Sequence, residues 1–212
     1  IAHDIPPQDV LSGAFLLHSC VRFFPRGTIH IAVVDPGVGT DRLCIAVKCG
    51  GQVLLGPDNG LLMPAARSLG GPQAYSIALR SDASTTFHGR DILAPAAALL
   101  ALGEEAEALG PMVDPVDLDF GEPSRTERGL QAKVIYVDRF GNLILNMRKI
   151  PESDLCLKGR RLRRARTYAS GGRIEPLIIQ GSHGFAEIAV NQGSAAEAFC
   201  LKAGDRIELE EI

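Results

Sequence analysis

The sequence predicts an α/β domain, with a mostly parallel sheet between helices, followed by a small antiparallel β-barrel. In the first half, apolar strand-like runs alternate with segments of helical periodicity, a pattern typical of α/β layers. From Leu130 onward, short strand-like runs are divided by turns and no long helix is expected, which favours a barrel or, as the alternative, a sandwich. We therefore expect domains at residues 1–118 and 130–212, joined by a linker at 119–129 that has no apolar period.

The elements of the first domain follow from two patterns. Val10, Ala14, Leu17 and Val21 recur at helical spacing and predict a helix over 9–22. The β-branched run 28–34 is typical of a strand covered on both faces. The same patterns predict strands at 44–48, 52–55 and 75–79 and helices at 61–69 and 92–102.

The second domain is expected to consist of short strands. Its apolar runs are bounded by clusters of glycine, asparagine, aspartate and serine, which are typical of turns. The predicted strands are residues 131–137, 143–147, 163–168, 174–180, 185–190 and 205–210.

Composition narrows the class of protein. Of the 212 residues, 46% are hydrophobic and 22% are charged, as in ordinary globular proteins. The net charge of −3 argues against nucleic acid as a partner, and we expect the basic run 158–166 to be a solvated loop or strand pair. The five cysteines are scattered, which favours reduced thiols over a disulfide framework or a metal site. No run is long enough to span a membrane and none resembles a signal peptide, so we expect a cytoplasmic protein.

Two segments of the first domain carry polar side chains where an α/β sheet binds ligands. Asp35 directly follows the strand 28–34 and opens the glycine-rich turn that leads to Arg42. His88 stands beside Gly89, just before a predicted helix. Each segment has a structural alternative: a turn with a capping aspartate and a surface arginine in the first case, and a structural histidine in the second.

The second domain offers a separate group of candidates. Asp138, Phe140 and Asn142 place an acid, an aromatic ring and an amide within five residues, a combination that suits a ribose, a base and an adenine edge. A hairpin turn is the alternative. Ser182 lies in a glycine-bounded turn, and Glu187 follows within an otherwise apolar strand. A carboxylate in such a strand needs a partner, and an ammonium group is one possibility.

Six stretches, distributed in order over nearly the whole chain, carry a resemblance to a known family. They are Ile5-Pro6-Pro7-Gln8-Asp9-Val10, Val33-Val34-Asp35-Pro36-Gly37-Val38-Gly39-Thr40, Gly56-Pro57-Asp58-Asn59-Gly60-Leu61-Leu62, Thr86-Phe87-His88-Gly89-Arg90-Asp91, Asp138-Arg139-Phe140-Gly141-Asn142 and Ala189-Val190-Asn191-Gln192-Gly193-Ser194-Ala195-Ala196. No single stretch is decisive, but six in register are very specific. The chain resembles the S-adenosyl-L-methionine hydroxide adenosyltransferases, which are similar to the fluorinating and chlorinating adenosyl enzymes.

The resemblance implies an enzyme that hydrolyses S-adenosyl-L-methionine to adenosine and L-methionine, by in-line attack of an activated water on the adenosyl C5′. It implies Asp35, Arg42 and His88 as the water-activating set, with Arg42 as a charge clamp and the proton acceptor left open. It also implies a homotrimer whose active sites lie between subunits. No cofactor is expected, and no metal either, since the sequence has no ligand cluster of suitable spacing. The substrate contacts that it implies are Gln8, Asp138, Phe140, Asn142, Ser182, Glu187 and Asn191.

Two alternatives stay open: a halide-dependent adenosyltransferase, and a non-catalytic protein that binds adenosine or S-adenosylmethionine. A carboxylate at Asp35 disfavours a halide, because like charges about 4 Å apart cost roughly 4 kcal/mol at an effective dielectric of about 20. The family normally opens with a strand that ends in Thr-Asp-Phe-Gly and holds the ribose. The sequence has no such strand, and we expect that an upstream segment supplies it. The sulfonium epimer and the physiological role stay open.

Overall fold

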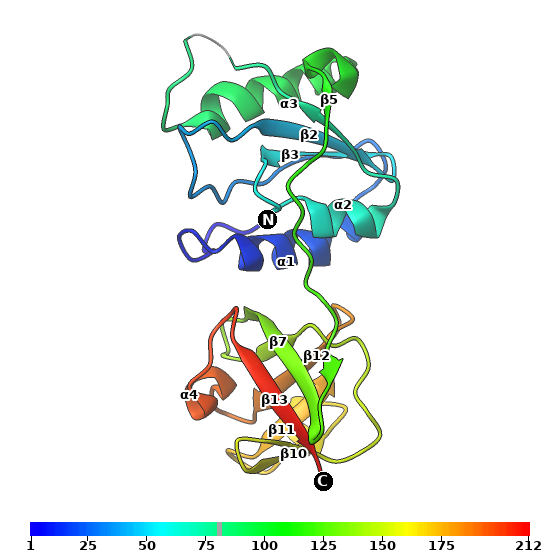
Figure 1. The fold of residues 1–212 in the computed structure, drawn as a ribbon, viewed down its shortest axis with the longest axis vertical. Coiled ribbons are helices and arrows are strands. Elements are labelled where there is room, and N and C mark those ends of the chain that lie inside the picture. Colours follow the sequence, from blue (N-terminus) through cyan, green and yellow to red (C-terminus); the bar gives the residue numbers. More distant parts are fainter. Residues whose placement is uncertain (80–81) are drawn as a thin grey trace. The chain divides into compact units, whose positions relative to one another are not determined.

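The computed structural model describes residues 1–79 and 82–212, and its contacts divide the chain into two compact units, Ile1–Asp119 and Phe120–Ile212. The first unit is an α/β sandwich. In Figure 1, α3 (Ala94–Ala101) lies on one face of its sheet, and α1 (Val10–Cys20) and α2 (Met63–Leu69) lie on the other. The predicted α/β architecture is therefore present.

The sheet of the first unit is mixed. Its order is β1 (Ile29–Ile31), β3 (Gln52–Pro57), β2 (Cys44–Cys49), β4 (Gln73–Ser76) and β5 (Met112–Val113). Within the described part of this sheet, β1 and β3 pair in parallel, while the other three pairings are antiparallel. The expectation of a mostly parallel sheet therefore holds for β1 and β3 alone. For β2 and β3 the reason is the two-residue turn Gly50-Gly51 that joins them, because parallel strands need a crossover of a dozen or more residues.

Local structure determines where the helices α1 and α3 begin. Asp9 caps α1: its carboxylate accepts the Ser12 backbone N–H at 3.0 Å and the Ser12 hydroxyl at 2.6 Å. The later helix begins earlier than predicted, with a π-helical turn over Gly89–Leu93 that continues into α3. Such turns are rare and occur often at functional sites. Short 3₁₀ turns at Val21–Phe23 and Ala106–Leu109 complete the unit.

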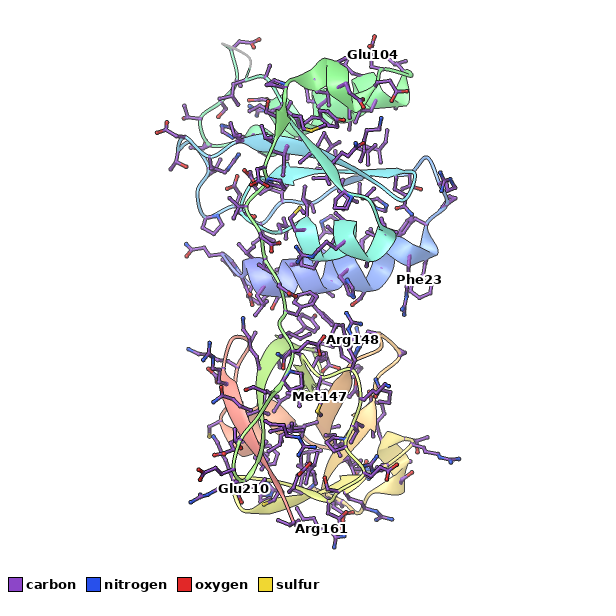
Figure 2. All side chains as sticks on the ribbon, turned by 45° about the vertical axis from the view of Figure 1, so that its right-hand side comes forward. Phe23, Glu104, Met147, Arg148, Arg161 and Glu210 are labelled. Atoms are coloured by element: carbon purple, nitrogen blue, oxygen red, sulfur yellow. The ribbon has the colours of Figure 1, made fainter. Side chains whose placement is uncertain are left out.

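The second unit, all of whose residues are described, is a closed barrel of seven strands. The ring runs β7 (Gly129–Val137), β8 (Leu143–Leu145), β12 (Ala186–Val190), β11 (Pro176–Gln180), β10 (Arg160–Arg164), β9 (Leu155–Leu157) and β13 (Arg206–Glu211), and β13 returns to β7. All pairings in the ring are antiparallel except β10–β11. In Figure 2, the Met147 side chain lies inside the barrel and the Arg161 side chain lies on its outside. The predicted barrel is present.

Several elements of the barrel differ from the sequence-based expectation. The strand predicted at 163–168 is displaced, because β10 spans Arg160–Arg164 and a 3₁₀ turn occupies Tyr168–Ser170. Strand β9 was not predicted, and neither was the short helix α4 (Ala195–Phe199), whose Phe199 packs into the barrel core. Three and five residues are too few for a periodicity to be recognised.

Part of the predicted linker 119–129 packs on the barrel. The Phe120 ring is buried and meets Phe185 edge-to-face, with 5.8 Å between ring centroids. Asn146 donates a side-chain N–H to the Phe120 carbonyl at 3.3 Å. Farther on, β6 (Ser124–Arg125) pairs with β7. The segment is therefore an ordered edge of the second unit.

Residues 1–79 and 82–212 contain no helix with both the length and the hydrophobicity that a membrane span requires.

The barrel seam between β7 and β13 gives a stability test. A Cβ at Gly129 would lie 2.1 Å from the Leu209 carbonyl oxygen, so the two strands would have to separate. We expect Gly129→Ala to lower the free energy of unfolding by about 2 kcal/mol or more, measured by urea unfolding followed by circular dichroism. Gly172→Ala is the control, because its Cβ would meet only the Glu175 side chain at ordinary contact distance. Equal stabilities of the two variants would contradict the seam packing.

Candidate active site

Asp35, Arg42 and His88 come together in the first unit. Asp35 follows β1, Arg42 lies just before β2, and His88 precedes the π-helical turn. The Nε of Arg42 donates to Asp35 Oδ1 at 2.8 Å, and its Nη2 donates to Asp35 Oδ2, which makes a bidentate ion pair. The same Nη2 lies 2.8 Å from Nδ1 of His88. The structure thus joins three residues that lie up to 53 positions apart in the sequence, the separation of Asp35 and His88 (88 − 35).

The guanidinium of Arg42 uses all of its hydrogen-bond donors. An arginine has five N–H groups and no acceptor. Besides the two bonds to Asp35 and the one to His88, Nη1 donates to the Leu43 carbonyl at 3.1 Å and to Cys44 Sγ at 3.1 Å. Five donors therefore meet five acceptors. Arg42 is held in one orientation and has no N–H left for another ligand.

This hydrogen-bond pattern also sets the tautomer of His88. Because arginine only donates, Nδ1 of His88 accepts from Arg42 and carries no proton. The neutral imidazole then carries its proton on Nε2. The cluster can thus present a donor at His88 Nε2 and acceptor lone pairs at Asp35.

The cluster is largely removed from solvent. The side chains of Asp35 and Arg42 are 6% and 10% exposed, and His88 is buried. Burial alone would lower the pKa of Arg42, but its hydrogen bonds to Asp35 and Cys44 and the nearby negative charge raise the pKa above the ordinary value. Arg42 therefore stays charged and neutralises Asp35 locally.

Gly39 holds the turn 35–42 against the segment that carries His88. Its φ is 79°, which favours glycine, and a Cβ there would lie 2.6 Å from the Thr85 carbonyl oxygen. The close approach brings the Asp35–Arg42 turn next to residues 85–88. Packing against Thr85 therefore requires a glycine at position 39, in addition to the positive φ of the turn.

Gln8 shares a hollow with Asp35. A cavity of about 350 Å³ is lined by Ala2, His3 and residues 5–8 together with Val33, Val34 and Asp35. Gln8 has a φ of 68°, an uncommon conformation for a residue other than glycine, and such outliers concentrate at ligand sites. The predicted contact at Gln8 thus lies beside the cluster.

Asp138 organises a turn in the second unit. Its Oδ1 accepts the backbone N–H groups of Phe140 and Asn142, each at 2.9 Å, and its Oδ2 accepts the Asn142 side-chain N–H at 2.8 Å. Asn142 is buried by this arrangement, while the Phe140 ring is 64% exposed with the Arg139 guanidinium over it. An exposed aromatic ring on a rigid turn is a surface on which a base can stack.

Glu187 has two neutral partners. It accepts a hydrogen bond from the Tyr168 hydroxyl and one from His183 Nε2 at 3.2 Å, and its side chain is 5% exposed. The Phe185 backbone N–H donates to His183 Nδ1 at 3.2 Å, which leaves the ring proton on Nε2. Burial, the bond to Glu187 and the charge of Asp138 raise the pKa of Tyr168 well above its usual range. Glu187 thus holds Tyr168 and His183 in place.

The remaining predicted contacts lie at two turns of the barrel. Ser182 is exposed in the turn between β11 and β12. Asn191 donates a side-chain N–H to the Gly171 carbonyl at 2.8 Å, which ties the end of β12 to the segment after Tyr168. The candidate residues therefore form one group in the first unit and one in the second.

Sequence reasoning missed Cys44, Tyr168 and His183. Cys44 is a buried strand residue whose sulfur also contacts Arg42, a contact that no local spacing indicates. Tyr168 lies in an irregular segment with no motif around it. Among the described residues, no group of three or more histidine, cysteine or acidic side chains is placed to hold a metal ion.

Comparison with known proteins places this geometry in a family. Residues 1–110 match the model of the SAM hydroxide adenosyltransferase N-terminal domain, and residues 132–208 match that of the C-terminal domain. The (R)-S-adenosyl-L-methionine hydrolases of Salinispora tropica and Thermus thermophilus are each 40% identical to the chain over 99% of its length, which covers 84% and 86% of theirs. A fluorinase of Actinopolyspora mzabensis is 26% identical over 96% of the chain and 84% of its own length.

Solved structures agree with the sequence matches. An uncharacterized conserved protein from Thermotoga maritima has a TM-score of 0.86 at 31% identity, covering 98% of this chain and 86% of that one. The α/β unit and the barrel, each matched by its own family model, define a two-domain class of proteins related to adenosyl-transferring enzymes. The chain belongs to the SAM hydroxide adenosyltransferase family.

The two bonds to Glu187 give a second stability test. An amide in place of the carboxylate turns one acceptor into a donor that faces Tyr168 or His183. We expect Glu187→Gln to lower the free energy of unfolding by about 1–3 kcal/mol, measured by urea unfolding. Glu210→Gln in β13 is the matched control. Unchanged stability together with weaker substrate binding would mean that Glu187 acts only as a ligand.

Proposed function

We propose that the chain hydrolyses S-adenosyl-L-methionine to adenosine and L-methionine. The observation that carries this proposal is the buried Asp35–Arg42–His88 cluster in a member of this family. The relatives that match most of the chain are named (R)-S-adenosyl-L-methionine hydrolases, and we propose the same (R) substrate here.

The reaction needs an activated water more than help for the leaving group. As the C5′–S bond breaks, its electron pair goes to the sulfur, and the sulfonium becomes the neutral thioether of methionine. The water oxygen forms the new C–O bond from the opposite side and loses a proton. Catalysis therefore depends on alignment and on a site with little bulk solvent.

Asp35 and His88 are suited to hold that water. His88 Nε2–H donates to the water oxygen, and an Asp35 lone pair accepts a water O–H. Asp35 then takes the proton as the C–O bond forms. Arg42 pairs with Asp35 and fixes the positions of both Asp35 and His88. His88 is the weaker candidate for proton acceptor, because Arg42 occupies its Nδ1. No step requires a metal or a cofactor.

The second unit supplies the proposed substrate contacts: Asp138, Phe140, Asn142, Ser182, Glu187 and Asn191, with Gln8 from the first unit. We propose a homotrimer with active sites between subunits. Exposed apolar side chains near the turn 35–42 support such an assembly, because a neighbouring subunit would cover them. Ile31, Val33 and Leu43 are 46%, 51% and 42% exposed. Five free cysteines support a reducing, cytoplasmic location.

Product analysis tests the function. Protein expressed from its complete gene is incubated with S-adenosyl-L-methionine, with and without chloride, and the products are separated. We expect adenosine and methionine in both cases. A 5′-chloro product would instead indicate a halide-dependent reaction, the alternative that the similarity to a fluorinase suggests. Tight binding without turnover would indicate a binding protein.

Single substitutions test the cluster. We expect Asp35→Ala and His88→Ala each to lower kcat by at least about a hundredfold, the scale of a general acid–base group. Asp154→Ala is the control, because that carboxylate pairs with Arg161 on the barrel surface. Rates are measured from adenosine release. Unchanged rates in both cluster variants would remove the cluster from the mechanism.

A further inference from the structure

We infer that Cys44 is a positioning residue for the reaction, because its buried thiol completes the set of acceptors that holds the Arg42 guanidinium. This inference rests on the proposed function. Its closing experiment includes a readout that does not depend on turnover.

The geometry places the sulfur at the centre of the cluster. Cys44 Sγ accepts an N–H from Arg42 Nη1 at 3.1 Å and lies 3.9 Å from His88 Nδ1. The residue is 1% exposed and begins strand β2. The Ile77 N–H binds its carbonyl at 2.7 Å, so the backbone that carries the thiol is fixed by the sheet. Cys44 therefore joins a rigid strand to two members of the cluster.

The thiol is neutral in this position. Burial raises the pKa of Cys44 even though Arg42 lies beside it, so the sulfur acts as a weak acceptor and its S–H as a weak donor. A neutral sulfur adds no negative charge beside Asp35. It satisfies one N–H of Arg42 without competing for the charge of the ion pair.

The positioning role follows from the count of donors. If Cys44 is lost, one Nη1–H of Arg42 remains buried with no acceptor at that position. The guanidinium gains freedom to turn toward another partner, and such a turn moves the Nη2 that Asp35 and His88 share. A misplacement of about 1 Å in a catalytic group can cost about a hundredfold in rate. Because the four other acceptors of Arg42 remain, we expect a smaller effect.

Strand β2 also supplies a matched control. Cys49 is buried in the same strand at 3% exposure, and the contact of its sulfur is with the Val47 carbonyl at 3.8 Å. Its substitution removes the same atoms from the same sheet without touching Arg42. An effect that comes only from core packing will appear in both positions.

The experiment compares kcat, KM and thermal unfolding for Cys44→Ala, Cys44→Ser, Cys49→Ala and Cys49→Ser. We expect Cys44→Ala to lower kcat about tenfold with KM nearly unchanged, because the water-activating groups move while the substrate contacts stay. Cys44→Ser should restore most of the rate, since a hydroxyl also accepts an N–H. The Cys49 variants should keep the wild-type kcat. A kcat of Cys44→Ala within twofold of wild type would overturn the inference, and so would an equal loss in Cys49→Ala.

Nitrogen NMR of His88 and Arg42 keeps the inference testable if the wild-type protein does not turn over the substrate. In the wild type we expect an unprotonated Nδ1 and a protonated Nε2 on His88, with slow rotation of the Arg42 guanidinium. Cys44→Ala should speed that rotation and shift the Nδ1 signal, while Cys49→Ala should do neither. Identical spectra for wild type and Cys44→Ala would sink the positioning role, whereas absent turnover with the expected spectra would refute only the proposed function.

Discussion

The buried ion pair between Arg42 and Asp35 is the interaction on which the candidate site depends. A carboxylate this far from solvent stays ionised only when a counter-charge and hydrogen bonds replace its lost hydration. Arg42 supplies both through two N–H groups that match the geometry of a carboxylate. Loss of one partner from a buried pair typically costs roughly 3–5 kcal/mol, because the other charge stays buried. The pair, together with the contact of Gly39 and Thr85, fixes the turn that carries the cluster.

Glu187 is buried as deeply as Asp35, but its charge is satisfied differently. Glu187 accepts hydrogen bonds from the Tyr168 hydroxyl and from the His183 ring, which is neutral because its Nδ1 accepts the Phe185 N–H. Among these hydrogen bonds, the negative charge of the Glu187 carboxylate therefore has no counter-charge, whereas Asp35 is paired with Arg42. A substrate with a sulfonium and an ammonium group benefits from such a charge nearby. This difference fits the two roles that we propose, in which Asp35 orders a water and Glu187 favours a cationic ligand.

The sequence could predict what depends on near neighbours. Asp35 and Arg42 lie seven residues apart around a glycine turn, so their proximity follows from local chemistry. The contact of Arg42 with His88 spans 46 residues and has no periodicity or spacing that encodes it, so only the family resemblance connected the two. The same limit applies to the fold. Local pattern predicts whether a segment is a strand or a helix. The direction of β3 relative to β2 depends instead on the short turn Gly50-Gly51 between them, and β9 is too short for its pattern to be detected.

Hydrogen-bonding capacity gives a second reason, besides charge repulsion, why this site suits water better than a halide. A halide ion only accepts hydrogen bonds, so a site for it needs several free donors. All five N–H groups of Arg42 already have acceptors, and the side chains of Asp35 and His88 add one strong donor, His88 Nε2–H. Asp35 adds acceptor lone pairs, which a halide cannot use. Water both donates and accepts, and it therefore matches one donor and one acceptor held at fixed positions. In the proposed mechanism, the arrangement that makes Arg42 a poor direct ligand is thus what favours water at Asp35 and His88.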